Sequence, residues 1–244
     1  MIAEKILNCP CYNIASKQEA EDFFLEKIKQ NNGGYTAAIN ALKILKYNKD
    51  KATKKAIDNA LIQTPDGFGA QLAFKVLHKQ KVIKLDLPGL VLDIANKHNL
   101  KTFFFGASEE NNSLAVANVK IQYPNINIVG RNNGFFKNTE EIEEKLAEAK
   151  PQLVMISLGS PKQEILSSEL NKKFPKIIFV GSGGRLDILA GKLNRAPKFF
   201  INNNLEWFYR LLKQPKRIKQ QILLVKFIYL LYSRKFLNII KRNK

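Results

Sequence analysis

Six short apolar runs, separated by segments of helical pattern, constrain the fold of this 244-residue chain more than any other feature of its sequence. They are YTAAIN (35–40), ALIQTP (60–65), KTFFFGA (101–107), INIVG (126–130), LVMISLG (153–159) and KIIFVGSGG (176–184). Strands that are apolar throughout and alternate with helices pair in parallel and are covered on both faces. The sequence therefore predicts an α/β fold, with a doubly wound, mostly parallel sheet and helices on both faces.

The corners that follow these runs are the predicted location of a ligand site. Open α/β sheets bind ligands beyond the carboxyl ends of their strands. Here those ends are TPDG (64–67), GASEE (106–110), GRNNGFF (130–136), LGSPKQE (158–164) and GSGG (181–184).

The sequence also predicts where three helices begin. Ser16 with Glu19 and Asn138 with Glu141 match the capping box, and Ser160 precedes Pro161 at an expected first helical position.

The net charge of +19 is concentrated in the C-terminal tail. From residue 192 onward the sequence has fourteen Lys or Arg residues and one acid, Glu206, so the tail carries a net charge of about +13. We expect a boundary near Arg195, with an α/β catalytic domain over 1–194 and a basic, amphipathic helical appendage over 195–244. Such a tail seeks an anionic partner, either nucleic acid or an acidic membrane surface.

The apolar run 222–232 favours the membrane. It is too short to span a bilayer but suits a helix lying in its surface, where Phe227, Ile228, Leu230 and Leu231 would be buried. A packed C-terminal helix, or a face for a homo-oligomer, is the alternative. Without a signal peptide or a long apolar span, and with only two cysteines, Cys9 and Cys11, the chain is expected in the cytoplasm.

Metal and histidine chemistry find no support in the sequence. His78 and His98 have no nearby ligand spacing, and no Asp-x-Asp pair could hold a divalent ion against a diphosphate. We therefore expect neither a metal nor a cofactor.

Asp66, in TPDGFG, has two interpretations. Its side chain could form the turn, as Asp often does, or it could be a base at the mouth of a cleft. The glycines of 181–184 could likewise form a flexible turn or contact a phosphate. Gln163, three residues after Ser160, could complete a capping box by bonding the backbone, or it could face a ligand.

Taken together, the corners resemble the WecG/TagA/CpsF glycosyltransferases. The matching segments, in order from about Asn40 to Arg217, are TPDGFG, FFFGASEEN, YPNINIVGRNNGFF, ISLGSPKQE and VGSGGRLDILAGKLNRAPKFFINNNLEWFYRLLKQPKR. Two positions depart from the family pattern: Ala38 stands where Thr is frequent, and Lys84 stands where Arg is frequent. Both departures bear on which donor sugar is used.

The resemblance implies an inverting enzyme that moves an N-acetylhexosamine of the N-acetylmannosamine type from UDP to a polyprenyl-diphosphate-linked sugar, in bacterial cell-surface polysaccharide synthesis. The enzyme would work at the inner face of the membrane. The implied catalytic residues are Asp66 as base, Gln163, Arg210 and Arg217. The implied substrate contacts are Asn40, Lys84, Gly106, Gly159, Lys162, Glu164, Gly181, Gly183, Gly184, Arg195 and Glu206. Because the arginines lie in the appendage, the site would be complete only when that segment folds over the cleft.

A non-catalytic nucleotide-binding or nucleic-acid-binding α/β protein is the alternative. An arm built for nucleic acid alone has little use for the apolar run 222–232, so we expect no nucleic-acid partner.

Overall fold

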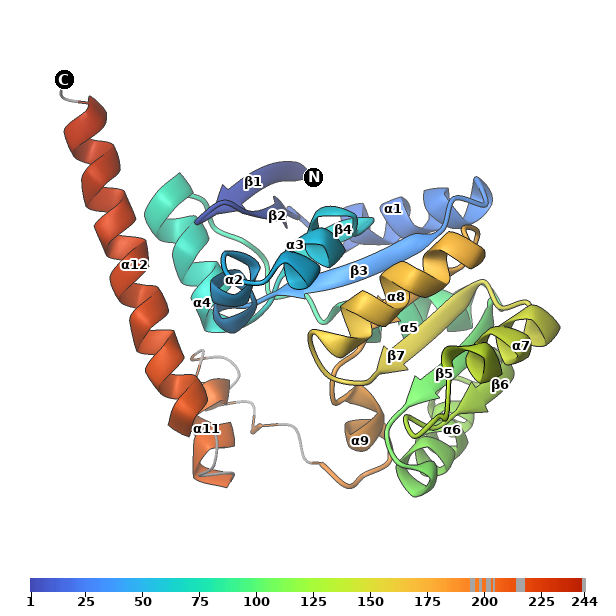
Figure 1. The fold of residues 1–244 in the computed structure, drawn as a ribbon. Coiled ribbons are helices and arrows are strands. Elements are labelled where there is room, and N and C mark those ends of the chain that lie inside the picture. Colours follow the sequence, from blue (N-terminus) through green and yellow to red (C-terminus); the bar gives the residue numbers. More distant parts are fainter. Residues whose placement is uncertain (194–195, 198, 201–202, 204, 214–217, 243–244) are drawn as a thin grey trace.

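A six-stranded parallel sheet forms the centre of the computed structural model (Figure 1). The structure describes residues 1–193, 196–197, 199–200, 203, 205–213 and 218–242. The strands are β3 (Gly34–Ile39), β4 (Ile62–Pro65), β5 (Lys101–Gly106), β6 (Asn127–Asn132), β7 (Leu153–Ser157) and β8 (Ile178–Gly181). Their order is β4-β3-β8-β7-β5-β6, and every pair is parallel. All six predicted strands are confirmed.

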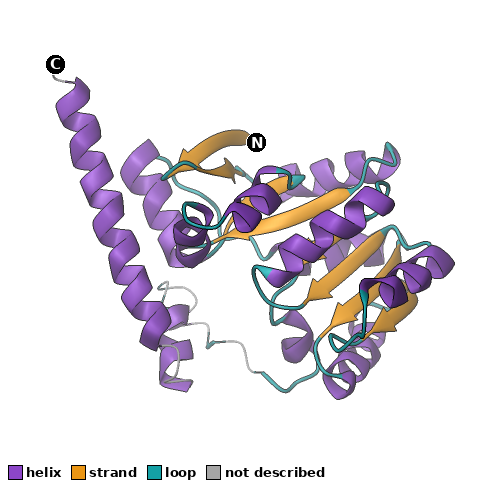
Figure 2. Ribbon diagram, in the orientation of Figure 1, coloured by secondary structure: helices purple, strands orange, loops and turns teal. Residues whose placement is uncertain are grey.

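Helices cover both faces of the sheet (Figure 2). They are α1 (Lys17–Lys29), α2 (Ala41–Tyr47), α3 (Lys51–Asp58), α4 (Gly67–Ala73), the π-helical turn η1 (Phe74–His78), α5 (Leu87–Lys97), α6 (Glu109–Gln122), α7 (Thr139–Ala149), α8 (Lys162–Lys173) and α9 (Arg185–Leu189). Successive strand residues point to opposite faces, so Phe104 packs in the core with α1, α5 and α6, whereas Phe103 and Phe105 pack in the core with α7 and α8. The doubly wound α/β architecture is thus confirmed.

An N-terminal hairpin was not anticipated from the sequence. Strands β1 (Ile2–Ile6) and β2 (Cys9–Asn13) pair antiparallel around a turn in which Leu7 and Asn8 both have positive φ. This two-residue turn matches the twist of a hairpin. The amide of Asn48, at the end of α2, donates to the Leu7 carbonyl at 2.9 Å and so fastens the turn to the domain.

Two of the three predicted helix starts are confirmed. The backbone N–H of Glu19 donates to Ser16 Oγ at 3.0 Å, and that of Glu141 donates to Asn138 Oδ1 at 3.1 Å. The third is wrong: α8 begins at Lys162 and has no side-chain cap, and the Ser160–Pro161 peptide is cis. The side chain of Gln163 instead bonds groups across the sheet edge, as described below.

The C-terminal region contains α11 (Glu206–Lys213) and the 25-residue helix α12 (Ile218–Arg242). One face of α12 packs on α2, α4 and η1, and there Phe227 and Leu231 are fully buried in the protein core. The expectation that these two side chains enter a membrane is therefore wrong, because the domain already covers them. Six apolar side chains of α12 form an exposed stripe elsewhere on the helix: Ile218, Ile222, Val225, Tyr229, Tyr232 and Phe236. Leu223 and Leu230 are also exposed.

Within the part of the chain that the structure describes, we find no helix that combines the length and the apolar character needed to cross a membrane.

Candidate active site

The carboxyl ends of the parallel strands bring the predicted corners to one edge of the sheet. Asp66 follows β4, Asn40 follows β3, Gly181 ends β8, and Gly159 follows β7, so these four lie along neighbouring strands. The backbone N–H of Asp66 donates to the Ile39 carbonyl at 2.9 Å, which places it directly beside Asn40. In Figure 1, α9 and α11 lie on the side of the sheet toward which the strands point.

Asp66 occupies the N-cap position of α4, but its carboxylate caps nothing. Asp50 and Asp86 start α3 and α5 in the usual way, each accepting a hydrogen bond from a backbone N–H three residues on. Asp66 is exposed, and no described residue donates a hydrogen bond to its side chain. The turn interpretation therefore does not explain why a carboxylate stands here.

The left-handed glycine after Asp66 explains how the charge is presented. Gly67 has a φ of +71°, which a residue with a side chain rarely adopts, and an added Cβ would meet open space. The chain therefore turns sharply out of the buried strand β4, and the Asp66 side chain is left at the surface of the edge.

Behind the edge lies a buried ion pair that the sequence analysis did not identify. Lys43, on α2, approaches Glu164, on α8, with Nζ and Oε1 at 2.7 Å, and the two side chains are 4% and 2% exposed. Asn40 caps α2 by accepting from the Lys43 backbone N–H at 3.0 Å. Only the position of Lys43 just after a helix start, on a face that must be buried, could have indicated its role.

Gln163 connects this ion pair to the glycine loop. Its Nε2 donates to Glu164 Oε1 at 3.0 Å, and its Oε1 accepts from the Gly183 backbone N–H at 3.2 Å. A Cβ on Gly181 would lie 2.7 Å from Gln163 Nε2, so a side chain there would displace this amide. A primary amide has two N–H groups, so Gln163 keeps one for a ligand.

Glu164 holds the neighbouring side chains of Lys43 and Gln163 in place. Its Oε1 accepts from both Lys43 and Gln163, and its Oε2 is buried without a hydrogen-bond partner among the described residues. The geometry thus gives Glu164 a supporting role for Lys43 and Gln163, and its expected substrate contact stays a prediction.

The glycine loop has fewer free backbone N–H groups for a ligand than expected. The N–H of Gly181 donates to Thr36 Oγ1 at 3.0 Å, that of Ser182 to the Ile156 carbonyl at 2.7 Å, and that of Gly183 to Gln163. Within 181–184, only the Gly184 N–H has no partner among the described residues. The expectation of a phosphate cradle is therefore narrowed to Gly184, at the start of α9.

Arg185, next to this loop, is a second residue that the sequence analysis missed. Its Nη1 lies 2.8 Å from Asp86 Oδ2, and its Nε is buried with no hydrogen-bond partner among the described residues. Lys84 is exposed two residues before Asp86 and also has an interaction partner. The segment 84–86 and the start of α9 thus form one charged group at the edge.

The β5 end of the edge is less suited to a phosphate. Hydrogen bonds from Asn133 and Arg131 hold the pKa of Glu109 below its usual value, so a carboxylate stands in the first turn of α6. Gly106 lacks a side chain for a structural reason, since a Cβ would lie 2.2 Å from the Ser157 carbonyl oxygen. Its expected substrate contact stays a prediction.

Gly159 and Lys162 line the β7 corner. Gly159 has a φ of +74° and open space where a Cβ would be, and both residues are exposed. The Lys162 ammonium lies 5.1 Å from the centre of the Phe136 ring. This cation–π contact directs Lys162 toward the loop after β6.

The C-terminal candidates are only partly visible. Arg195 and Arg217 lie outside the described residues, and of Arg210 only the backbone, within α11, is described. Glu206 begins α11 and has an interaction partner. The described residues contain no group of three or more His, Cys, Asp or Glu side chains that could hold a metal ion.

These features define a doubly wound α/β protein with a candidate ligand site at the carboxyl edge, which contains the exposed carboxylate of Asp66 and the buried amide of Gln163. A sequence model of the family described as "Glycosyl transferase WecG/TagA/CpsF family" matches residues 4–240. The chain belongs to this family, and it is a glycosyltransferase.

Two relatives share 30% identity with the chain. Both are named N-acetylglucosaminyldiphosphoundecaprenol N-acetyl-β-D-mannosaminyltransferase. The protein from Bacillus spizizenii aligns over 204 residues, covering 82% of this chain and 79% of its own length. The protein from Bacillus subtilis aligns over 232 residues, covering 93% of this chain and 90% of its own length.

Proposed function

We propose that this protein transfers an N-acetylmannosamine-type sugar, with inversion, from a UDP-sugar to a polyprenyl-diphosphate-linked N-acetylglucosamine in the synthesis of a cell-surface polysaccharide. The names of both relatives contain this sugar and this acceptor. The observation that supports the proposal best is the exposed Asp66 carboxylate, which no described residue engages.

In the proposed reaction Asp66 is the general base. It takes the proton from the acceptor hydroxyl while that oxygen forms a bond to the anomeric carbon. The bond between the anomeric carbon and the diphosphate oxygen breaks on the opposite side, and UDP leaves with the electron pair. A positioned base contributes roughly 10²- to 10⁴-fold to such a step.

The leaving diphosphate gains negative charge as this bond breaks, and cations and N–H groups at the site would stabilise it. We assign this role to Arg210 and Arg217 of the appendage, with the free N–H of Gln163 orienting the sugar or a phosphate. Arg185 and the Gly184 N–H are described groups at the same edge that could share the task.

The acceptor's polyprenyl chain resides in a membrane, so the enzyme must work at its surface. We propose that residues 195–244 dock on the anionic inner face of the cell membrane. Near such a surface each basic residue contributes about 1 kcal/mol. The exposed apolar side chains of α12 add burial in the interface.

A donor panel tests the proposal. UDP release should be measured with UDP-N-acetylmannosamine, UDP-N-acetylglucosamine and UDP-glucose, using a short-chain lipid-diphosphate N-acetylglucosamine as acceptor. Release that depends on the acceptor and is largest with UDP-N-acetylmannosamine is expected, and it should persist in EDTA. Transfer from another donor would contradict the proposed donor sugar. Loss of activity in EDTA that magnesium restores would reveal a metal requirement.

Arg210→Ala and Arg217→Ala test the roles of these residues. Each should slow turnover while vesicle binding stays, because each removes one charge of many. Unchanged turnover would indicate that other cations at the edge, such as Arg185, stabilise the leaving diphosphate instead.

A further inference from the structure

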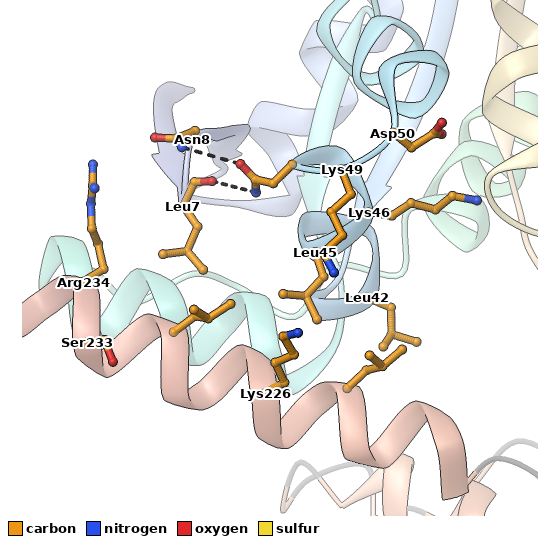
Figure 3. A pocket seen from close by; sticks show the side chains of 13 residues that line it. Leu7, Asn8, Leu42, Leu45, Lys46, Lys49, Asp50, Lys226, Ser233 and Arg234 are labelled. Carbon is orange, nitrogen blue, oxygen red and sulfur yellow. Dashed lines mark hydrogen bonds between the residues drawn. The ribbon is translucent and has the colours of Figure 1, made fainter.

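A cavity lies between α12, α2 and the hairpin turn (Figure 3). Its volume is about 670 Å³. That is within the range of about 300–1,000 Å³ typical of ligand pockets. The apolar part of its wall consists of five leucines: Leu7, Leu42, Leu45, Leu223 and Leu230. A chain of methylene groups suits such a wall.

The rim of this groove is positively charged. Lys46, Lys49, Lys226 and Arg234 all line it and are exposed, and none forms a salt bridge with any acid that the structure describes. Figure 3 shows the ammonium groups of Lys49 and Lys226 directed toward each other across the groove. The one acid in the lining, Asp50, is committed to Thr53 as a helix cap. An anion between the two ammonium groups would relieve their repulsion.

The groove also lies beside the surface that would meet a bilayer. Six exposed apolar side chains, spaced by three or four residues from Ile218 to Phe236, form an outer stripe along α12 and are between 49% and 71% exposed. At 100° per residue, Leu223, Lys226 and Leu230 fall on the flank between this stripe and the buried face that contains Phe227. A lipid beside the stripe could therefore enter the groove without leaving the interface.

We propose that the groove binds one acyl chain of an anionic glycerophospholipid, with its phosphate between Lys49 and Lys226. The cations are arranged along the length of the groove. This arrangement suits a groove that lies beside anionic headgroups in the plane of a bilayer. A prenyl diphosphate carries its charges at its sugar-bearing end, which the catalytic edge would hold instead. A second copy of this chain is disfavoured, because both partners would bring a net charge of +19. The proposal rests on the proposed membrane docking of residues 195–244, but not on the identity of the donor or the acceptor.

The test uses the full-length protein on vesicles of phosphatidylcholine with or without phosphatidylglycerol that carries a photoreactive acyl chain. After irradiation, labelled peptides are mapped. Labels at Leu45 and at Leu223 or Leu230 are expected with phosphatidylglycerol. Labels confined to the outer stripe, or equal groove labelling by a photoreactive phosphatidylcholine, would overturn the proposal.

A matched pair of variants separates the groove from general surface charge. Lys49→Gln with Lys226→Gln removes two groove cations, whereas Lys55→Gln with Lys235→Gln removes two exposed cations from the same two regions outside the groove lining. The groove variant should lose groove labelling by about tenfold and the control should change by less than about twofold. Equal losses would overturn the proposal, as would displacement of the label by a stoichiometric amount of lipid-diphosphate sugar.

Discussion

At the scale of single residues, Asp66 differs from every other Asp that begins a helix. It stands at the N-cap position of α4 and gives that helix no hydrogen bond, whereas Asp50 bonds both the backbone and the hydroxyl of Thr53. A residue that does not stabilise its own turn is free to be selected for chemistry. The two aspartates therefore make a matched pair for mutation.

Asp66→Asn should reduce transfer by roughly 10²- to 10⁴-fold, because an amide keeps the shape but cannot accept the proton. UDP binding should stay nearly unchanged. In the same experiment, Asp66→Ala should leave the free energy of unfolding almost unaltered, whereas Asp50→Ala should lower it by about 1 kcal/mol through loss of a cap. Turnover and urea denaturation measure the two effects. Full activity in Asp66→Asn would return Asp66 to a structural role.

Cys9 provides a pH-dependent prediction. Burial, with a smaller effect of Asp58, raises the pKa of its thiol from 9.0 to about 12. The folded thiol therefore keeps its proton at a pH where the unfolded thiol has lost it, so the free energy of unfolding should fall as the pH rises from 9.0 toward about 12. Alkylation of Cys9 by iodoacetamide at pH 9 should be roughly a hundredfold or more slower in the native protein than in urea. Equal rates in both states would show that the hairpin does not shield the thiol.

Local residue patterns were predictable, and distant partners were not. Ser16 and Asn138 bond groups three residues away, so their caps follow from sequence alone. Gln163 has the same spacing from Ser160, yet its side chain bonds Gly183, which only the sheet brings near. The same limit hid Lys43, whose partner Glu164 is 121 residues away.

At the scale of elements, the Lys43–Glu164 pair is a buried polar link between α2 and α8. Both helices begin at the carboxyl edge, so this link holds Asn40 on one side and Gln163 on the other. Buried ion pairs seldom add net stability, but they penalise the loss of one partner. The edge is therefore sensitive to any change in this pair.

Lys43→Met should lower the free energy of unfolding by about 3–5 kcal/mol, because Glu164 would be left as an uncompensated buried charge. The double variant Lys43→Met with Glu164→Leu should recover most of that loss. As a control, Lys17→Met breaks the surface pair with Asp93, whose side chains are 61% and 52% exposed, and should cost less than about 1 kcal/mol. Denaturant unfolding measures all three. If Lys43→Met matched the control, the pair would not couple the helices.

The six strands of the main sheet could be read from the sequence because each is apolar on both faces and too short to be a helix. The N-terminal hairpin could not, since its strand IAEKI is mostly exposed and CPCYN contains a proline. Its turn is formed by Leu7 and Asn8, which lack the glycine that usually marks such turns.

At the scale of the whole molecule, α12 has two apolar faces with different tasks. The face with Phe227 and Leu231 completes a core shared with Ile44 and Phe74, and the opposite stripe is exposed. Sequence hydropathy could not separate them, because both faces contribute to the same apolar run. Deleting the appendage would therefore damage the fold as well as any membrane contact, so point variants are needed.

Val225→Glu with Tyr229→Glu should reduce binding to anionic vesicles by at least about tenfold, because it places two carboxylates in the outer stripe. The melting temperature and the turnover of a short-chain soluble acceptor should remain close to those of the wild type. Phe227→Ala is the contrasting variant, and it should lower the free energy of unfolding by about 3–5 kcal/mol. Vesicle sedimentation and thermal unfolding distinguish the two. Unchanged sedimentation of the double variant would assign the stripe to another partner.

The strand order has a consequence for how the protein is made. β3 and β4 are joined to the rest of the main sheet only through β8, in which Ile178 is the register partner of Gly34. β3 can therefore be paired on both sides only after β8 has been synthesised. Pairings of such long sequence separation are slow and leave strand edges uncovered meanwhile. During synthesis the first third of the chain would therefore remain an open edge until the ribosome has released β8, and it would depend on chaperones over that interval. A chain stopped after α8 should aggregate when translated without chaperones, whereas one that includes β8 and all later residues should stay in the supernatant after centrifugation.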